Sequence, residues 1–173
     1  MQIDQVKLQN YSGLWCIEPS RFSQQCAMLG LIDLKAHVAA QPEPKRNVAG
    51  IGRKFDTAAG SVAVVDVQGT LTKAGSSLGG GGTIEMRQAI RKANEDKSIG
   101  GIILTIDSPG GTVSGTSDLA AEVANSAKPI VAYVEDLCCS AAMWVASQCD
   151  EIYANNATAI VGSIGTFMGL YDV

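Results

Sequence analysis

Apolar and polar positions divide most of this chain into alternating strands and helices. Short apolar runs rich in β-branched residues predict strands over residues 61–67, 101–106, 129–134, 151–154 and 158–161. Apolar side chains at helical spacing predict helices between these strands, over residues 83–94, 117–127 and 140–148. Strands without strict alternation, separated by helices, are typical of sheets covered by helices with right-handed crossovers. The predicted fold class is therefore α/β.

The first 54 residues differ from the rest of the chain. Apolar positions that include Phe22, Cys26 and Leu29 recur at helical spacing and predict an amphipathic helix over residues 21–37, capped by Ser20. Residues 40–54 combine prolines and glycines with basic residues, which is the composition of an exposed linker. We expect an N-terminal helical segment and linker over residues 1–54, and a folded core over residues 55–173.

The last twelve residues do not read as the end of a domain. A Gly-Ser-Ile-Gly turn leads into a mixed segment that stops at Asp172 and Val173 without a helix cap or a polar tail. We expect the core to be C-terminally truncated. Such a fragment would expose apolar faces that its missing layers would cover.

Composition and charge exclude several classes. The chain is 46% hydrophobic and 17% charged with 19 glycines, which is typical of a compact soluble protein with many tight turns. A net charge of -4, with no Lys/Arg stripe interleaved with aromatics, argues against a nucleic-acid partner. The N-terminus does not read as a secretory signal, and no apolar run approaches the roughly 18 residues of a membrane span. We expect a soluble, cytoplasmic protein with no membrane partner.

The cysteines indicate neither a disulfide framework nor a zinc site. They form an odd set without C-x-x-C spacing: Cys16, Cys26, Cys138, Cys139 and Cys149. A reducing compartment accounts for them, and small buried thiols are common packing residues. No metal or organic cofactor is implied.

Ser140 is the first candidate for chemistry. It follows an apolar strand and precedes Ala141 and Ala142, which open a predicted helix. A hydroxyl on a sharp strand-to-helix turn suits a nucleophile, and the helix N-terminus favours an oxyanion. Serine is also a common helix N-cap, so the position alone leaves a capping role open.

A second motif supports the catalytic interpretation. Ser108, Pro109, Gly110 and Gly111 follow another apolar strand. Pro-Gly after a strand indicates a turn, but two glycines can also present bare backbone N–H groups to a substrate carbonyl and leave an edge for a peptide strand. Together the two motifs predict an acyl-transfer site.

Three motifs in order carry a resemblance to a known family. They are Asp-Ser-Pro-Gly-Gly at residues 107–111, Cys-Ser-Ala-Ala-Met-Trp-Val-Ala-Ser at 139–147 and Val-Gly-Ser-Ile-Gly at 161–165. The chain resembles the signal peptide peptidase A family of serine peptidases over roughly residues 61–173. Within that family it resembles the phage minor capsid protein C type, the prohead protease.

The resemblance implies a fold of the Clp-protease and crotonase kind, built from stacked β-β-α units, and assembly into a homo-oligomer. It also implies that Ser140 is the nucleophile, with the backbone N–H groups of Gly111 and Ala141 as the oxyanion hole. Gly110 would permit the turn, and Ser163 would help to orient the general base.

The general base is where the sequence departs from the family pattern. The family uses a lysine some tens of residues after the serine, but no Lys, Arg or His follows Ser140. Lys128 precedes the nucleophile and is expected in a solvated loop, and Lys73 is no better candidate for the general base. His37 is the only histidine and would reach the core only if the N-terminal segment folded back over it.

Two further motifs have structural explanations. The four glycines at residues 79–82 lack the Gly-Lys-Ser/Thr ending of a phosphate-binding loop and are expected to form a flexible loop at the mouth of the groove. Asp107 is expected to orient the glycine turn rather than to act in catalysis.

The leading hypothesis is a serine endopeptidase with a Ser-Lys dyad that matures phage capsids, acting on a peptide or protein substrate such as a scaffold protein. In this chain the catalytic lysine is missing, so the fragment itself is expected to be inactive. A non-catalytic module that binds capsid scaffold on the same fold is the alternative. A crotonase-like acyl-CoA enzyme is a third reading, which the lack of a carboxylate pair near the glycines disfavours.

Overall fold

The computed structural model describes residues 14–31, 33, 36, 53–57, 60–75 and 80–168. Its elements are β1 (Leu14–Ile17), α2 (Pro19–Gly30), β2 (Arg53–Thr57), β3 (Gly60–Gln68), α4 (Thr83–Glu95), β4 (Ile99–Ser108), β5 (Gly110–Thr112), α5 (Thr116–Ala124), β6 (Ile130–Cys139), α6 (Ala141–Ala146), β7 (Glu151–Ala154), β8 (Ile160–Gly162) and β9 (Phe167–Met168).

A six-stranded sheet forms the centre of the molecule. Its strand order is β2-β3-β4-β6-β7, with β8 also paired to β6. The pairs β3–β4, β4–β6, β6–β7 and β6–β8 are parallel, whereas β2 pairs with β3 in the antiparallel direction. A mainly parallel sheet joined by helices confirms the predicted α/β class.

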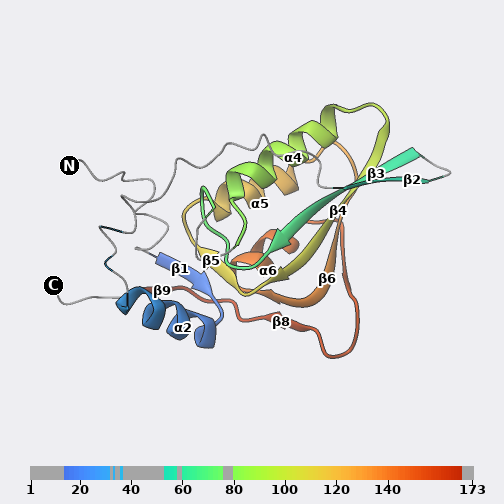
Figure 1. The fold of residues 1–173 in the computed structure, drawn as a ribbon. Coiled ribbons are helices and arrows are strands. Elements are labelled where there is room, and N and C mark those ends of the chain that lie inside the picture. The colour runs from blue at the N-terminus through green and yellow to red at the C-terminus, as the bar shows by residue number, and fades with distance from the viewer. Residues whose placement is uncertain are drawn as a thin grey trace.

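Helices α4 and α5 lie side by side along the sheet (Figure 1). On α4 the buried residues Met86, Ala89, Ile90 and Ala93 follow the i, i+3, i+4, i+7 spacing of one helix face. They join alternate side chains of the strands in one core, including Ala63, Val65 and Val67 from β3 and Ile102, Leu104 and Ile106 from β4. Branched and small aliphatic residues therefore form the core.

A second, three-stranded sheet lies beside the first and has the order β5-β1-β9. Strand β1, from the N-terminal segment, pairs in the antiparallel direction with both neighbours. Figure 1 shows β1, drawn in blue, beside β5 and below the central sheet. The N-terminal segment is therefore hydrogen-bonded to a strand of the predicted core.

The predicted elements exist, but several of their ends differ. Helix α2 begins at Pro19, so the prediction of Ser20 as its cap is wrong, and the Glu18 carboxylate accepts the backbone N–H groups of Ser20 and Arg21 instead. Proline is well tolerated at the first helical position, which moves the cap one residue earlier. The last two residues of the predicted linker, Arg53 and Lys54, belong to strand β2 and pair with β3. Residues 40–52 lie outside the described part of the chain.

Strand β6 extends five residues beyond its predicted end. Its last three residues, 137–139, pair with β8, while Ser108 of β4 pairs with Cys138. The apolar pattern did not predict this extension because the polar residues Glu135 and Asp136 interrupt it. Helix α5 ends at Ala124, three residues before its predicted end, where the Asn125 side chain donates to the Ala121 carbonyl.

The glycines at residues 80–82 form a packed contact rather than the predicted flexible loop, and Gly79 is outside the described residues. The Gly81 N–H donates to the Gln68 carbonyl, and the Gly81 carbonyl accepts from Thr72. A Cβ atom on Gly80 would lie 1.8 Å from the Thr70 oxygen. Only glycine allows this close approach of two backbones.

Candidate active site

The register between β4 and β6 brings the two predicted motifs together. Ser108 pairs with Cys138, across a register shift that follows Ile106. The glycine turn after β4 and Ser140 after β6 therefore lie at the same carboxyl-end edge of the parallel strands. This is the edge at which open α/β sheets bind ligands.

Ser140 has a strained backbone at the junction of β6 and α6. Its φ of 55° and ψ of -111° are rare for a residue with a side chain. The strain is held by two backbone bonds, from the Ser140 N–H to the Gly162 carbonyl at 2.7 Å and from the Trp144 N–H to the Ser140 carbonyl at 2.9 Å. The Ser140 hydroxyl makes no capping bond to α6, so the capping interpretation is wrong.

The Ser140 hydroxyl contacts two groups from other elements. Its oxygen lies 2.9 Å from the Cys16 sulfur and donates to the Gly165 carbonyl at 3.1 Å. Ser140 is only 1% exposed. The hydroxyl is therefore positioned, but covered by the N-terminal segment.

The turn beside it requires both glycines. Gly110 has a φ of +100°, and a Cβ there would lie 2.3 Å from the Cys16 oxygen and 3.0 Å from the Ala141 nitrogen. A Cβ on Gly111 would lie 1.9 Å from the Leu71 oxygen. The turn therefore brings the backbones of Gly110 and Ala141 close together.

Ser108 fixes the turn, a role that the sequence analysis did not assign to it. Its buried hydroxyl donates to the Gly69 carbonyl at 2.6 Å and accepts the Gly110 N–H at 3.2 Å. The sequence prediction gave this orienting role to Asp107, whose backbone carbonyl instead accepts the Gly69 N–H at 2.9 Å. The signal was present in the Ser-Pro-Gly-Gly motif, since serine often bonds nearby backbone.

Ser163 lies next to the residue that holds Ser140. It has a φ of 52° and follows Gly162, whose carbonyl accepts the Ser140 N–H. The Ser163 residue is exposed. Its proposed partner, the general base, is not among the residues that follow Ser140, and His37 lies outside the described residues.

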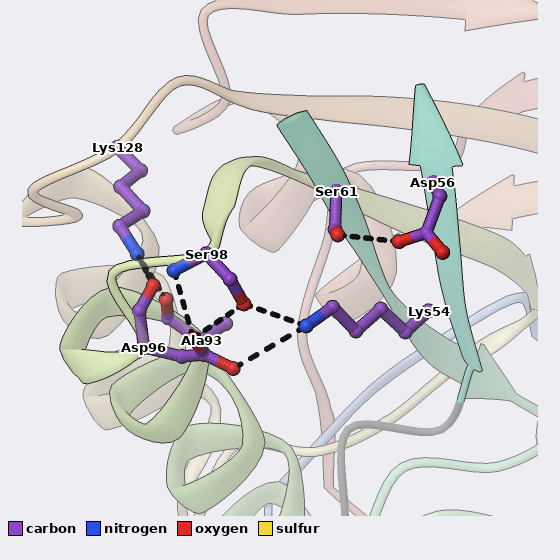
Figure 2. Close-up of polar contacts among 7 residues, drawn as sticks. All are labelled: Lys54, Asp56, Ser61, Ala93, Asp96, Ser98 and Lys128. Atoms are coloured by element: carbon purple, nitrogen blue, oxygen red, sulfur yellow. Dashed lines mark hydrogen bonds and ion pairs between the residues drawn. The ribbon is translucent and has the colours of Figure 1, made fainter. Parts of the chain in front are cut away.

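Lys128 has a structural role. Its ammonium group donates to the Ala93 and Asp96 carbonyls, both at 2.5 Å, at the C-terminal end of α4 (Figure 2). A cation satisfies the free carbonyls and the negative end of the helix dipole there. Lys128 is therefore half-buried and bonded at a helix end rather than in the predicted solvated loop, and the location of the catalytic base stays a prediction.

Figure 2 also shows a surface Ser–Lys pair that is not a catalytic dyad. Lys54 donates to the Ser98 hydroxyl at 2.6 Å, while Ser98 donates to the Asp96 carboxylate at 2.6 Å. The ammonium also lies 3.7 Å from that carboxylate, and the bonds from Ser98 lower the pKa of Asp96. Lys54 and Ser98 are both exposed, and the Ser98 hydroxyl donates to a carboxylate rather than to the lysine.

Three cysteines of the core, Cys138, Cys139 and Cys149, are poor nucleophiles. Burial raises the pKa of Cys138 to about 12 and the pKa of Cys149 to about 12, and burial also raises the pKa of Cys139. Thiols held in the neutral form react slowly. The described residues contain no group of three or more metal-ligating side chains, and none of their helices is long and apolar enough to cross a membrane.

A family model matches the part of the chain that contains this site. The model is that of the N-terminal domain of NfeD1b, and it matches residues 61–167. The chain belongs to this family. The matched region contains the glycine turn, Ser140 and Ser163, but not β1.

Curated relatives connect the chain with peptidases. Protease 4 of Haemophilus influenzae is 33% identical over 109 residues, which cover 61% of this chain and 18% of the relative. Capsid assembly protease C of Escherichia phage lambda is 34% identical over 113 residues, 62% of this chain and 26% of the relative. These relatives confirm the resemblance to the signal peptide peptidase A family and its phage capsid proteases. The chain spans about a quarter or less of the length of either relative.

Solved structures of enoyl-CoA hydratases also match. A member of the enoyl-CoA hydratase/isomerase family matches with a TM-score of 0.47 and 17% identity, over 59% of this chain and 46% of that one. An enoyl-CoA hydratase from Mycobacterium smegmatis matches with a TM-score of 0.42 and 20% identity, over 60% of this chain and 49% of that one.

Proposed function

We propose that the chain carries the nucleophile and oxyanion hole of a serine endopeptidase. The observation that carries this proposal is the strained Ser140 beside the Gly110–Gly111 turn. Strain of about 1–3 kcal/mol at a non-glycine residue persists only where surrounding contacts hold it, and such residues cluster at active sites. Relatives that are named proteases support the same assignment.

In this reaction the Ser140 oxygen attacks the carbonyl carbon of a peptide bond. The backbone N–H groups of Gly111 and Ala141 stabilise the oxyanion, a contribution of about 3–4 kcal/mol for a single donor in comparable enzymes. The base takes the hydroxyl proton and returns it to the leaving amine, which leaves an acyl group on Ser140. Water then attacks the acyl-enzyme and releases the second product.

The base in this proposal is a lysine of the full-length protein. Ser163 orients it, since Ser163 adjoins the Gly162 carbonyl that holds Ser140. A lysine serves as a base only when burial lowers its pKa, by up to about 3–5 units. No such lysine follows Ser140 in the sequence, so this chain is proposed to be inactive by itself.

A capsid assembly protease among the relatives supports the proposed substrate and setting. The proposed substrate is a capsid scaffold protein, cleaved in the host cytoplasm or inside the procapsid. Assembly as a homo-oligomer is part of this proposal, supported by exposed apolar side chains on β7 and β8 at Ile152, Tyr153, Ile160 and Val161. Sedimentation of the extended protein as a monomer would contradict the proposed homo-oligomer.

The test is active-site labelling of the chain extended through its downstream reading frame. A fluorophosphonate probe should add to Ser140, as shown by intact mass and peptide mapping, and Ser140→Ala should abolish the label. Ser147→Ala is the matched control, because Ser147 lies at the other end of α6, is exposed and bonds only locally. Labelling that survives in Ser140→Ala contradicts the assignment.

A non-catalytic scaffold-binding module is the second candidate. It is favoured by the covered hydroxyl of Ser140 and by the missing base. Absence of any label in a folded extended protein, together with binding of scaffold protein, would support this candidate over the peptidase.

A further inference from the structure

Strand β1 occupies the edge of β5 at the candidate active site. It lies between β5 and β9, with Trp15 opposite Thr112, Cys16 opposite Gly111 and Ile17 opposite Gly110. Trp15, Cys16 and Ile17 are 3%, 7% and 0% exposed. The segment is thus a buried strand at an edge where an extended peptide could otherwise pair.

The hydrogen-bond pattern places the Cys16 carbonyl on a proposed oxyanion donor. The Val113 N–H donates to the Leu14 carbonyl at 2.9 Å, and the Glu18 N–H donates to the Pro109 carbonyl at 2.8 Å. Hydrogen-bonded pairs alternate along an antiparallel ladder, so the pair between them, Cys16 and Gly111, is also hydrogen-bonded. The Gly111 N–H therefore faces the Cys16 carbonyl.

The second proposed oxyanion donor, the Ala141 N–H, also lies close to the Cys16 carbonyl. A Cβ built on Gly110 meets both the Cys16 oxygen, at 2.3 Å, and the Ala141 nitrogen, at 3.0 Å. The side chain of Cys16 contacts the nucleophile, because its sulfur lies 2.9 Å from the Ser140 oxygen. One residue of β1 thus contacts or adjoins the nucleophile and both proposed oxyanion donors.

We propose that β1 is a tethered, substrate-like strand that occupies the peptide groove and must leave before another peptide can bind. This rests on the proposed function of Ser140 and Gly111. The groove accordingly takes an extended peptide that pairs antiparallel with β5, with a small side chain opposite Gly111 and large apolar side chains on either side of it.

Because β1 is part of the same chain as the groove, it competes strongly with any added peptide. A segment linked within the same chain acts at an effective concentration in the millimolar range. Packing of Trp15 against Phe22 of α2, with ring centroids 6.4 Å apart, further holds the strand in place. An added peptide of equal intrinsic affinity therefore binds the unaltered chain only weakly, and release of β1 strengthens its binding.

The experiment measures binding of a fluorescein-labelled peptide with the sequence of residues 12–20, with serine in place of the cysteine. Cys16→Pro removes the N–H that pairs with Gly111. It should raise the affinity for the peptide at least tenfold by fluorescence anisotropy, and it should speed hydrogen exchange at the Gly111 and Val113 amides. Cys26→Ser removes a thiol outside β1 and should change neither. Faster exchange at both amides without tighter peptide binding overturns the proposal.

The unaltered chain provides an independent test that needs no mutation in β1. Saturating peptide should release β1 and speed alkylation of Cys16 at least fivefold relative to Cys26, measured by mass spectrometry. Binding of the peptide without faster alkylation of Cys16 overturns the proposal.

The same titration in Ser140→Ala separates this inference from the proposed function. Peptide binding should persist in Ser140→Ala, since it depends on the edge of β5 rather than on the nucleophile. If the extended protein that carries Cys16→Pro binds the peptide but its Ser140 does not react with the probe, the peptidase is refuted and β1 remains an occupant of the groove.

Discussion

The Ser140 oxygen and the Cys16 sulfur lie 2.9 Å apart although 124 positions separate them in the chain. The contact exists because β1 pairs with β5 while the register of β4 and β6 brings Ser140 to the same edge. The N-terminal segment and the predicted core therefore meet at the candidate nucleophile.

Gly111→Ala should destabilise the fold, because its new Cβ would lie 1.9 Å from the Leu71 oxygen. We expect a loss of about 2–4 kcal/mol in the free energy of unfolding, as for other overpacked buried positions. Urea denaturation followed by circular dichroism measures this loss. Gly165→Ala is the control, since nothing lies within 4 Å of its added Cβ, and it should stay within about 0.5 kcal/mol of the parent. Equal stability of the two variants would show that β5 does not pack against Leu71 as described.

Lys128→Met should weaken the fold but leave the nucleophile intact. The two carbonyls at the end of α4 lose their cation, at a cost of about 0.5–1.5 kcal/mol. In the extended protein Ser140 should still react with the fluorophosphonate probe at the parental rate. Loss of labelling in a variant that remains folded would identify Lys128 as the base and overturn its assignment as a helix cap.

Glu18→Gln should loosen the start of α2 in a pH-dependent way. Hydrogen bonds from the Ser20 side chain and backbone lower the pKa of Glu18, so its ionised form is stabilised in the folded state. That stabilisation is present above the ordinary glutamate pKa and is lost as the pH falls through the lowered value. The difference in melting temperature between parent and Glu18→Gln should therefore be clear at pH 7 and should vanish in strong acid.

Glu95→Gln is the matched control for this effect. Glu95 is the last residue of α4, where a negative charge opposes the helix dipole, so its neutralisation should not lower the melting temperature at pH 7. Equal losses in both variants would contradict the capping role of Glu18.

The thiols of Cys138 and Cys149 should resist alkylation in the folded protein. Because burial raises the pKa of each to about 12, roughly one thiol in 10,000 is ionised at pH 8. Unfolded cysteines ionise near pH 8.5, so the unfolded state releases these protons first and stability should fall as the pH rises above that value. Iodoacetamide labelling with and without urea, mapped by mass spectrometry, measures this protection. Rapid labelling of Cys149 in the native state would refute it.

Local patterns were sufficient for most of the fold. Apolar runs predicted β3 and β4, and helical spacing predicted α4 to within one residue at its C-terminal end, because these elements pack one face on a shared core. The apolar run over residues 151–154 also predicted β7, although all four of its residues are exposed. The prediction failed where the decisive contact is not local. The extension of β6 past Glu135 depends on pairing with β8, and the cap of α2 depends on which side chain reaches its free N–H groups.

The sequence by itself determined the class of the fold, the order of its elements and the residues suited to acyl transfer, since periodicity and short motifs are local properties of the chain. Only the tertiary structure decided that Ser140 is strained and makes no side-chain capping bond, that Ser108 fixes the glycine turn, and that Cys16 covers the site. These relations depend on strand register and on the pairing of distant segments, where a shift of one residue moves every side chain to the opposite face.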